Sequence, residues 1–224
     1  MASRDVAVVP VRAGSKGLPG KNTRPFAGQP LYLRAVHQGL RCVSSCVIST
    51  DDPTVLNASM PQGGHLHQRP AQLAQDSTPM APVLKDVILA CGLEDARLVL
   101  LQATTPLRDD SDITQALSLH DTGDYDTVLS VRETNPTVLK YGTLQGAEFT
   151  AISSPEYCFS NRQDLPSVFA PNGAVYVFSA ADFLKAGAIP SARMGAVVMP
   201  VERSHDIDNR EDFDRAEALA QASE

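Results

Sequence analysis

The chain has 224 residues, of which 43% are hydrophobic and 20% are charged, and its formal net charge is −7. This length suits one globular domain with a sizeable core and is short for two domains. An acidic chain disfavours nucleic-acid binding, and no apolar run approaches the roughly 20 residues of a membrane span. The N-terminal residues lack the apolar core of a signal peptide, so we expect a cytoplasmic protein that binds neither nucleic acid nor membranes.

Cysteine and histidine do not occur at the spacings that are typical of metal sites. The chain has four cysteines, none in a CxxC pair, and five histidines that form no HExxH motif. The cysteines are Cys42, Cys46, Cys91 and Cys158. We therefore expect reduced thiols and no structural zinc site.

Apolar runs of strand length alternate with helical patterns along the chain. In chain order we predict a strand over 6–11, a helix over 30–40, a strand over 46–50, a helix starting at Asp52-Pro53, a helix over 82–93, a strand over 97–102, a helix over 111–120 and a strand over 127–131. After residue 171 we predict a strand over 174–178, a helix over 180–185, a strand over 196–201 and a helix over 209–222. Strands with little polar alternation, separated by helices, indicate a mostly parallel sheet with both faces covered.

Residues 140–171 interrupt this pattern. Glycine, serine and proline are scattered there among single apolar residues, which indicates an inserted antiparallel flap and not a linker. We expect one three-layer α/β/α domain of Rossmann-like type over 1–224, with a small β-rich insertion at about 140–171. Ligands of such folds bind at the carboxyl ends of the strands, so the segments that follow strands hold the candidate functional residues.

The loop after the first strand, residues 12–22, contains three glycines and three cations in the sequence RAGSKGLPGKN. Glycines let backbone N–H groups approach an anion, and Arg12, Lys16 and Lys21 add positive charge, a combination that suits a polyphosphate. The loop is neither a GxGxxG motif nor a Walker A motif, since Asn22 stands where that motif requires Ser or Thr. The alternative is a solvated basic turn, which the concentration of cations in an acidic chain disfavours.

Two aspartates, Asp206 and Asp208, follow the last predicted strand. In extended backbone, residues i and i+2 face the same side, so these two carboxylates can share one divalent cation such as Mg²⁺. The structural alternative is that Asp208 or Asn209 caps the final helix, with Glu211 in its first turn. The two roles are compatible.

The segment PVRAGSKGLPGKN at residues 10–22 resembles the signature loop of the acylneuraminate cytidylyltransferases, the CMP-sialic acid synthetases. Further blocks that resemble this family follow in order: STD at 49–51, RP at 69–70, LA at 73–74 with Asp76, LLQATTPLR at 100–108, RQDLP at 162–166, PNGAVY at 171–176 and DID at 206–208. The resemblance implies a nucleotidyltransferase fold and Mg²⁺-dependent transfer of CMP from CTP to a nine-carbon acidic sugar, with release of pyrophosphate. It also implies a homodimer in which the insertion reaches across to the partner.

The resemblance assigns a nucleotide site and a metal site. The implied nucleotide-binding residues are Arg12, Ala13, Gly14, Ser15, Lys16, Lys21, Asn22, Arg69, Asp76 and Gln102. Mg²⁺ is expected on Asp206 and Asp208, and the implied catalytic residues are Arg12, Lys21 and Asp208. The base that takes the proton of the sugar hydroxyl stays open between Asp208 and a metal-bound hydroxide.

The resemblance also assigns residues to the acidic sugar, namely Gln102, Lys140, Arg162, Asn172 and Tyr176. Several of the candidate residues also have a structural explanation that requires no ligand.

Arg69 can form a surface ion pair, and Asp76 can belong to the turn before the next helix. Asp51 can cap the helix that follows it. Asn172 can belong to a tight turn with Gly173, and Tyr176 can be an ordinary core residue.

Two departures from the family pattern fall on the sugar side. Ala170 stands where many relatives have arginine, and Ile189-Pro190 stands where some relatives have an aromatic pair. CTP is therefore better specified than the sugar, which stays open among sialic, legionaminic and pseudaminic acids. The loop at 15–17 disfavours 3-deoxy-manno-octulosonic acid, and the intact Lys21 and acidic pair disfavour a non-catalytic nucleotide-binding protein.

Overall fold

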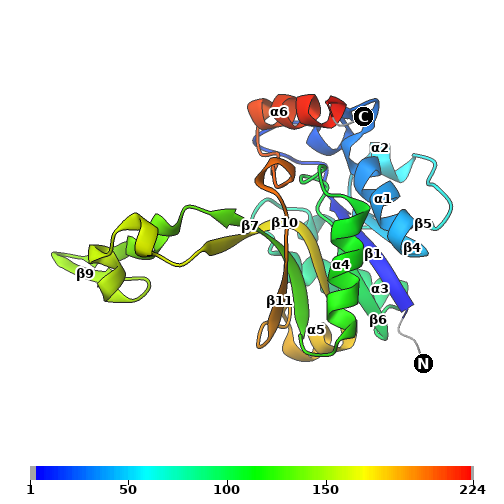
Figure 1. Ribbon diagram of the computed structural model, residues 1–224. Helices are drawn as coiled ribbons and strands as arrows, with labels where there is room; N and C mark the ends of the chain where they lie inside the picture. The colour runs from blue at the N-terminus through cyan, green and yellow to red at the C-terminus, as the bar shows by residue number, and fades with distance from the viewer. Residues whose placement is uncertain (1–3, 223–224) are drawn as a thin grey trace.

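A seven-stranded sheet forms the centre of the molecule in the computed structural model, which describes residues 4–222 (Figure 1). The strand order is β11-β7-β10-β6-β1-β4-β5. The strands are β1 (Arg4–Val11), β4 (Ser45–Thr50), β5 (Gly64–Gln68), β6 (Ala96–Leu100), β7 (Thr127–Thr134), β10 (Val168–Ser179) and β11 (Met194–Val198). Every pairing in this sheet is parallel except those of β10, which runs antiparallel to both β6 and β7. The predicted mostly parallel sheet is confirmed.

Helices cover both faces of this sheet and complete the predicted three layers. Helices α1 (Leu31–Cys42) and α4 (Asp110–Asp121) pack on one face, and α3 (Met80–Cys91) and α5 (Ala180–Ala186) pack on the other. Strand β1 shows why its sequence lacks polar alternation, since Ala7 and Val9 enter the first core while Val6 and Val8 enter the second.

A third core lies beneath the last helix, α6 (Arg210–Gln221), and connects it to the loop after β1. Phe213 of α6 meets Phe26 edge to face, with ring centroids 5.5 Å apart. Asn209 caps α6 through a capping box with Asp212, so the capping alternative foreseen for Asn209 is confirmed. This packing fixes the residues just before α6 against the loop after β1.

Strand β5 was absent from the prediction, because its sequence GHLHQ has a single apolar residue, Leu66, among polar ones and so contains no apolar run. It forms because the backbone of β4 offers it a parallel partner at the sheet edge. The predicted strand over 196–201 is wrong in its end, since β11 stops at Val198. Pro200 has no N–H to extend a ladder, and a 3₁₀ turn, η6 (Val201–Arg203), follows it.

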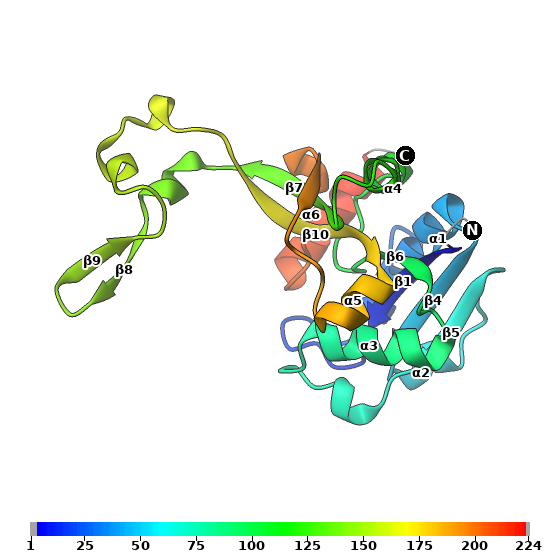
Figure 2. The same ribbon diagram turned by 90° about the horizontal axis from the view of Figure 1, so that it is seen from below.

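Strands β7 and β10 run past the sheet as a paired ribbon and carry a projection that points away from the helices (Figures 1 and 2). The projection contains an antiparallel hairpin and three 3₁₀ turns. These elements are η3 (Pro136–Lys140), β8 (Gly142–Gln145), β9 (Glu148–Ala151), η4 (Pro155–Phe159) and η5 (Arg162–Asp164).

The shorter elements are β2 (Pro25–Phe26), β3 (Gln29–Pro30), α2 (Pro53–Leu56), η1 (Lys21–Thr23) and η2 (Ala71–Leu73). The predicted start of α2 is confirmed, because the Asp52 side chain accepts a hydrogen bond from the N–H of Thr54. Among the helices of residues 4–222, none combines the length and apolar character needed to cross a membrane.

Candidate active site

A cavity of about 240 Å³, the first cavity, opens at the carboxyl ends of β1 and β6. It brings together residues from five separate segments of the sequence. From the predicted site its lining includes Arg12, Gly14, Ser15, Lys21, Asn22, Arg69, Gln102, Asp206 and Asp208. This is the edge of the sheet at which such folds bind ligands.

Lys21 connects the glycine-rich loop to residues 206–208, which we name the acidic segment. Its Nζ donates a hydrogen bond to the carbonyl oxygen of Ile207 and lies 4.0 Å from Oδ1 of Asp208. Burial lowers the pKa of Lys21, and the nearby Asp208 and Asp206 carboxylates oppose that shift. The ammonium group is thus held at the floor of the cavity by two groups of the same acidic segment.

Gly17 shows how closely these two segments approach. A Cβ atom placed on Gly17 would lie 2.1 Å from the carbonyl oxygen of Asp208. Only glycine fits this contact without movement of the backbone, so the loop and the acidic segment form one unit.

Asp206 and Asp208 both line the first cavity. Desolvation raises the pKa of Asp206, and the Asp208 carboxylate adds to this effect, while a hydrogen bond from Thr104 opposes it. Two carboxylates that repel each other beside a cavity are a donor set that suits a hard divalent cation. Residues 4–222 contain no group of three or more His, Cys, Asp or Glu placed to hold a metal, so this pair leaves most ligand positions to water or a bound molecule.

Asp76 pairs with two cations of the loop. Its carboxylate accepts a hydrogen bond from Arg12 and lies 2.9 Å from Nζ of Lys16. Hydrogen bonds from Lys16 and Arg12 lower the pKa of Asp76. Asp76 therefore pairs with the two cations, Arg12 and Lys16, that the sequence analysis expects to bind phosphate.

The backbone of the loop is fixed from two sides. The N–H of Ala13 donates to Oδ1 of Asp51 at 2.9 Å, and Nδ2 of Asn22 donates to the carbonyl oxygen of Arg12 at 3.1 Å. The cap of α2 is Asp52, so Asp51 instead stabilises the loop.

Arg69 is only 5% exposed and is held by the end of β4. Its Nη2 donates to the carbonyl oxygen of Ser49 at 2.8 Å, and its Nε donates to the Ser49 hydroxyl at 3.2 Å. No surface ion pair forms among the described residues, so that alternative for Arg69 is wrong.

A chain of hydrogen bonds extends from Arg69 to helix α3. Oγ of Ser49 lies 3.1 Å from Nδ1 of His67, and Nε2 of His67 lies 3.1 Å from Oδ2 of Asp86. The guanidinium only donates, so the Ser49 hydroxyl gives its own proton to Nδ1, and Nε2 carries the proton that faces Asp86. Burial lowers the pKa of His67, which agrees with a neutral imidazole in this chain. We name Asp86, His67, Ser49 and Arg69 the relay.

Arg108 ties the end of β6 to the turn of β10. It is 1% exposed and donates to the carbonyl oxygens of Gln102 and Ala174 and, at 3.1 Å, to Oε1 of Gln38. Burial lowers its pKa to about 9. These bonds set the position of Gln102 in the first cavity.

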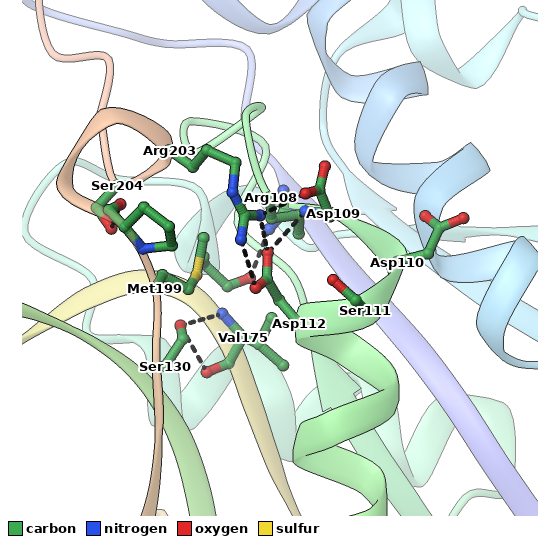
Figure 3. A network of polar contacts seen from close by, with 12 residues as sticks. Arg108, Asp109, Asp110, Ser111, Asp112, Ser130, Val175, Met199, Arg203 and Ser204 are labelled. Atoms are coloured by element: carbon green, nitrogen blue, oxygen red, sulfur yellow. Dashed lines mark hydrogen bonds and ion pairs between the residues drawn. The ribbon is translucent and has the colours of Figure 1, made fainter. Parts of the chain in front are cut away.

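A second tie joins helix α4 to the segment before Asp206. Nη2 of Arg203 donates to Oδ1 of Asp112 at 3.1 Å, and Nη1 lies 2.9 Å from Oδ2 of Asp109 (Figure 3). Asp112 is buried, and its hydrogen bonds from Arg203 raise the pKa of that guanidinium. The acidic segment is therefore anchored from both ends, by Arg203 and by α6.

A second cavity of about 520 Å³ adjoins the first, and the two share Gln102 and Asp206 in their linings. Tyr176 lines this second cavity, and desolvation raises its pKa, with Asp206 adding to the effect. Tyr176 also packs against the second core, so the core alternative stands beside the cavity position, and its contact with a sugar stays a prediction.

Asn172 also borders the second cavity, but its amide is engaged within the protein. Its Oδ1 accepts from Oγ of Ser130 at 2.6 Å and from the N–H of Ala174 at 3.2 Å. Its Nδ2 donates to Oγ of Ser204 at 2.9 Å. Asn172 therefore joins β7, β10 and the acidic segment, and its contact with a sugar stays a prediction.

Lys140 and Arg162 lie on the projection and line neither cavity. Lys140 donates to the carbonyl oxygen of Ser160, and Arg162 is exposed in η5. Within one chain these two cations are not brought to Asn172 and Tyr176, and their sugar-binding role stays a prediction.

Residues 6–221 match the family model described as cytidylyltransferase. The chain belongs to the cytidylyltransferase family. An N-acylneuraminate cytidylyltransferase of Streptococcus agalactiae is 30% identical over 222 residues, which cover 94% of this chain and 52% of that protein. The chain thus spans about half the length of the Streptococcus relatives it matches.

Other relatives match over their whole length. A CMP-N,N'-diacetyllegionaminic acid synthase of Legionella pneumophila is 28% identical, covering 99% of this chain and 98% of that protein. The solved structure of CMP:2-keto-3-deoxy-manno-octonic acid synthetase complexed with CTP has a TM-score of 0.75 at 16% identity, covering 99% of this chain and 100% of that one. At this identity the structural likeness shows a shared fold.

The sequence reasoning missed several residues that line the two cavities. Thr104, Arg132 and His205 line the cavities without having been predicted. Thr104 lies within the recognised block at 100–108, which was the available signal. Arg132 and His205 follow no motif, and only the folded arrangement reveals them.

Proposed function

We propose that this protein transfers CMP from CTP to an acidic nonulosonic sugar of the N-acylneuraminate or legionaminate type and releases pyrophosphate. The observation that carries the proposal is the first cavity, which joins a cationic glycine-rich loop to Asp206 and Asp208 at the carboxyl edge of the sheet. The names of the Streptococcus and Legionella relatives support the choice of nucleotide and sugar class.

The first cavity suits the nucleotide. Arg12, Lys16 and Lys21 are the cations expected to hold the triphosphate, which displaces Asp76 from the first two. Arg69 and Gln102 are expected to contact the cytosine or ribose, since a buried guanidinium and an amide provide the donors and the acceptor that such groups need.

In the reaction, the anomeric hydroxyl oxygen of the sugar bonds to the α-phosphorus, and the bond from that phosphorus to the bridging oxygen of pyrophosphate breaks. The hydroxyl proton passes to a base, for which Asp208 is the candidate in the first cavity. The protein contributes mainly positioning of the two substrates and neutralisation of the triphosphate charge by Arg12 and Lys21.

Asp206 and Asp208 fit Mg²⁺ as a pair of hard oxygen donors. Mg²⁺ bound there would neutralise charge on the phosphates and so favour departure of pyrophosphate.

We also propose a cytoplasmic homodimer in which a second copy covers the projection. Five large apolar side chains on the projection are more than half exposed, and Phe159 reaches 91%. They are Tyr141, Leu144, Phe149, Ile152 and Phe159. An apolar surface of this kind is typical of an interaction site. The same docking would offer Lys140 and Arg162 to the partner's second cavity.

The reaction is tested by measuring pyrophosphate release from CTP and Mg²⁺ with N-acetylneuraminic acid, N,N'-diacetyllegionaminic acid and 3-deoxy-manno-octulosonic acid. Turnover of one acid with CTP, absent with UTP and lost in Asp208→Ala, supports the proposal. Binding of CTP without turnover of any acid contradicts it and favours a nucleotide-binding protein without catalysis.

The dimer is tested by light scattering after gel filtration. We expect a mass of two chains for the wild type and of one chain for Leu144→Asp/Phe159→Asp. The control Leu89→Asp changes an exposed apolar residue of α3, outside the projection, and is expected to leave the mass unchanged. A monomeric wild type contradicts the dimer.

A further inference from the structure

The second cavity contains a positive charge that no described residue pairs. Its lining carries the guanidinium of Arg132, beside the carboxylate of Asp206 and the imidazole of His205. A guanidinium keeps its charge in proteins, whatever the state of that imidazole. Arg132 is therefore the cation that the described residues present to this cavity.

The guanidinium of Arg132 makes no ion pair or hydrogen bond with residues 4–222, although the side chain is half-buried. Two other half-buried arginines are paired with carboxylates, Arg97 with Asp5 and Arg203 with Asp112. An unpaired guanidinium that borders a cavity retains all its donors for a bound anion.

The strand register explains why this side chain is open to the cavity. Arg132 of β7 lies opposite Ala170 of β10 in the antiparallel ribbon. Residues that lie opposite each other in such a pair point to the same face, with Cβ atoms about 5 Å apart. The methyl group of Ala170 is too short to cover or to neutralise the guanidinium.

The residues that the sequence assigns to the sugar do not supply this charge within one chain. Lys140 and Arg162 lie on the projection, and the amide of Asn172 is engaged by Ser130 and Ser204. Arg132 borders the same cavity as Tyr176 and Gln102, and Gln102 is shared with the first cavity.

We propose that Arg132 binds the carboxylate of the acceptor sugar and so selects acidic sugars over neutral ones. The planar guanidinium matches a carboxylate with two parallel hydrogen bonds, which a lysine or an amide at this position does not reproduce. This inference rests on the proposed function, since it assigns the second cavity to the acceptor.

The test compares Arg132→Gln and Arg132→Lys with the wild type in the pyrophosphate assay, at saturating CTP and then at saturating acid. The probes are N-acetylneuraminic acid, N,N'-diacetyllegionaminic acid and the uncharged carboxamide of whichever acid the wild type converts. Arg193→Gln is the matched control, because that exposed arginine pairs with Asp126, at the other end of β7.

We expect Arg132→Gln to lower kcat/KM for the acid by roughly 10- to 100-fold, the loss of a charge-assisted bidentate contact. The KM for CTP and the thermal unfolding midpoint stay near their wild-type values, and the preference for acid over carboxamide disappears. Arg132→Lys falls between the two, and Arg193→Gln matches the wild type.

An unchanged KM for the acid in Arg132→Gln overturns the inference and leaves the proposed function standing. An equal rise of the KM for CTP, or a wild type that converts the carboxamide as well as the acid, overturns it too. A wild type that neither binds nor converts any acid refutes the proposed function, and this inference with it.

Discussion

Substitution of Ser49 by alanine isolates the part of the relay that positions Arg69. Ser49 is fully buried, and its hydroxyl serves both Nε of Arg69 at 3.2 Å and Nδ1 of His67 at 3.1 Å. Removing it leaves two buried polar groups without a partner, one of them on a cation. At about 1–3 kcal/mol for each of the two groups, we expect the free energy of unfolding to fall by about 2–6 kcal/mol.

The same substitution leaves Arg69 attached only through Nη2, at 2.8 Å from the carbonyl oxygen of Ser49. A guanidinium that is free to rotate must be ordered again when the nucleotide binds, at a cost of about 1 kcal/mol. This cost corresponds to a KM for CTP that is about five-fold higher. We expect kcat to stay unchanged, because Arg69 is assigned to the cytosine or ribose and not to the phosphorus that is transferred.

The assay is steady-state pyrophosphate release with CTP varied, together with chemical denaturation of the same samples. Ser45→Ala is the matched control on the same strand, since its buried hydroxyl has no hydrogen-bond partner among the described residues. Equal effects of Ser45→Ala and Ser49→Ala would refute the reasoning, as would a fall in kcat with an unchanged KM for CTP.

Three further predictions follow from the same geometry. Gly17→Ala places a Cβ atom 2.1 Å from the Asp208 carbonyl oxygen unless the backbone moves, so we expect loss of pyrophosphate release and a free energy of unfolding that is lower by about 1–3 kcal/mol; wild-type values would contradict the close packing. Arg108→Met leaves the carbonyl oxygens of Gln102 and Ala174 without their buried donor, so the free energy of unfolding measured by denaturation should fall by about 3 kcal/mol or more. An unchanged free energy of unfolding would refute a structural role for these bonds. Burial lowers the pKa of His67 below its ordinary 6.5, so the folded state binds its proton less readily than the unfolded chain. The stability that neutral His67 contributes is complete above pH 6.5 and is lost as the pH falls through the lower folded-state value; His67→Gln should flatten this part of the stability profile.

The layers of the fold could be predicted because the buried strands carry continuous apolar runs. Val6 to Val9 alternate between two cores, and that double burial is visible in the sequence as an absence of polar residues. Strand β5 escaped prediction because its stability comes from the backbone of β4, and backbone pairing leaves no mark on side-chain composition.

The candidate site divides in the same way. The loop at 12–22 and the pair Asp206 and Asp208 were predictable, since glycines, cations and carboxylates were clustered along the chain. Arg132 was not, because its meaning depends on register with Ala170, a residue brought opposite by a long excursion through the projection. Lys140 and Arg162 are the opposite case. The family resemblance assigns them to the sugar, but the sequence does not show that they lie on the projection, away from both cavities.

The cations of the site differ in whether they already pair with a carboxylate of the protein. This difference matters for binding the two anionic substrates that we propose. Arg12 and Lys16 already share the carboxylate of Asp76, and Lys21 lies beside Asp208. A ligand with a single negative charge gains little there, because it must replace a carboxylate of equal charge, whereas a triphosphate brings several charges and repays the displacement. Among the described residues Arg132 has no partner, so a carboxylate that binds there, as we propose, displaces no group of the protein. In the proposed reaction this difference sorts the two anions, with the nucleotide directed to the paired cations and the sugar acid to the unpaired one.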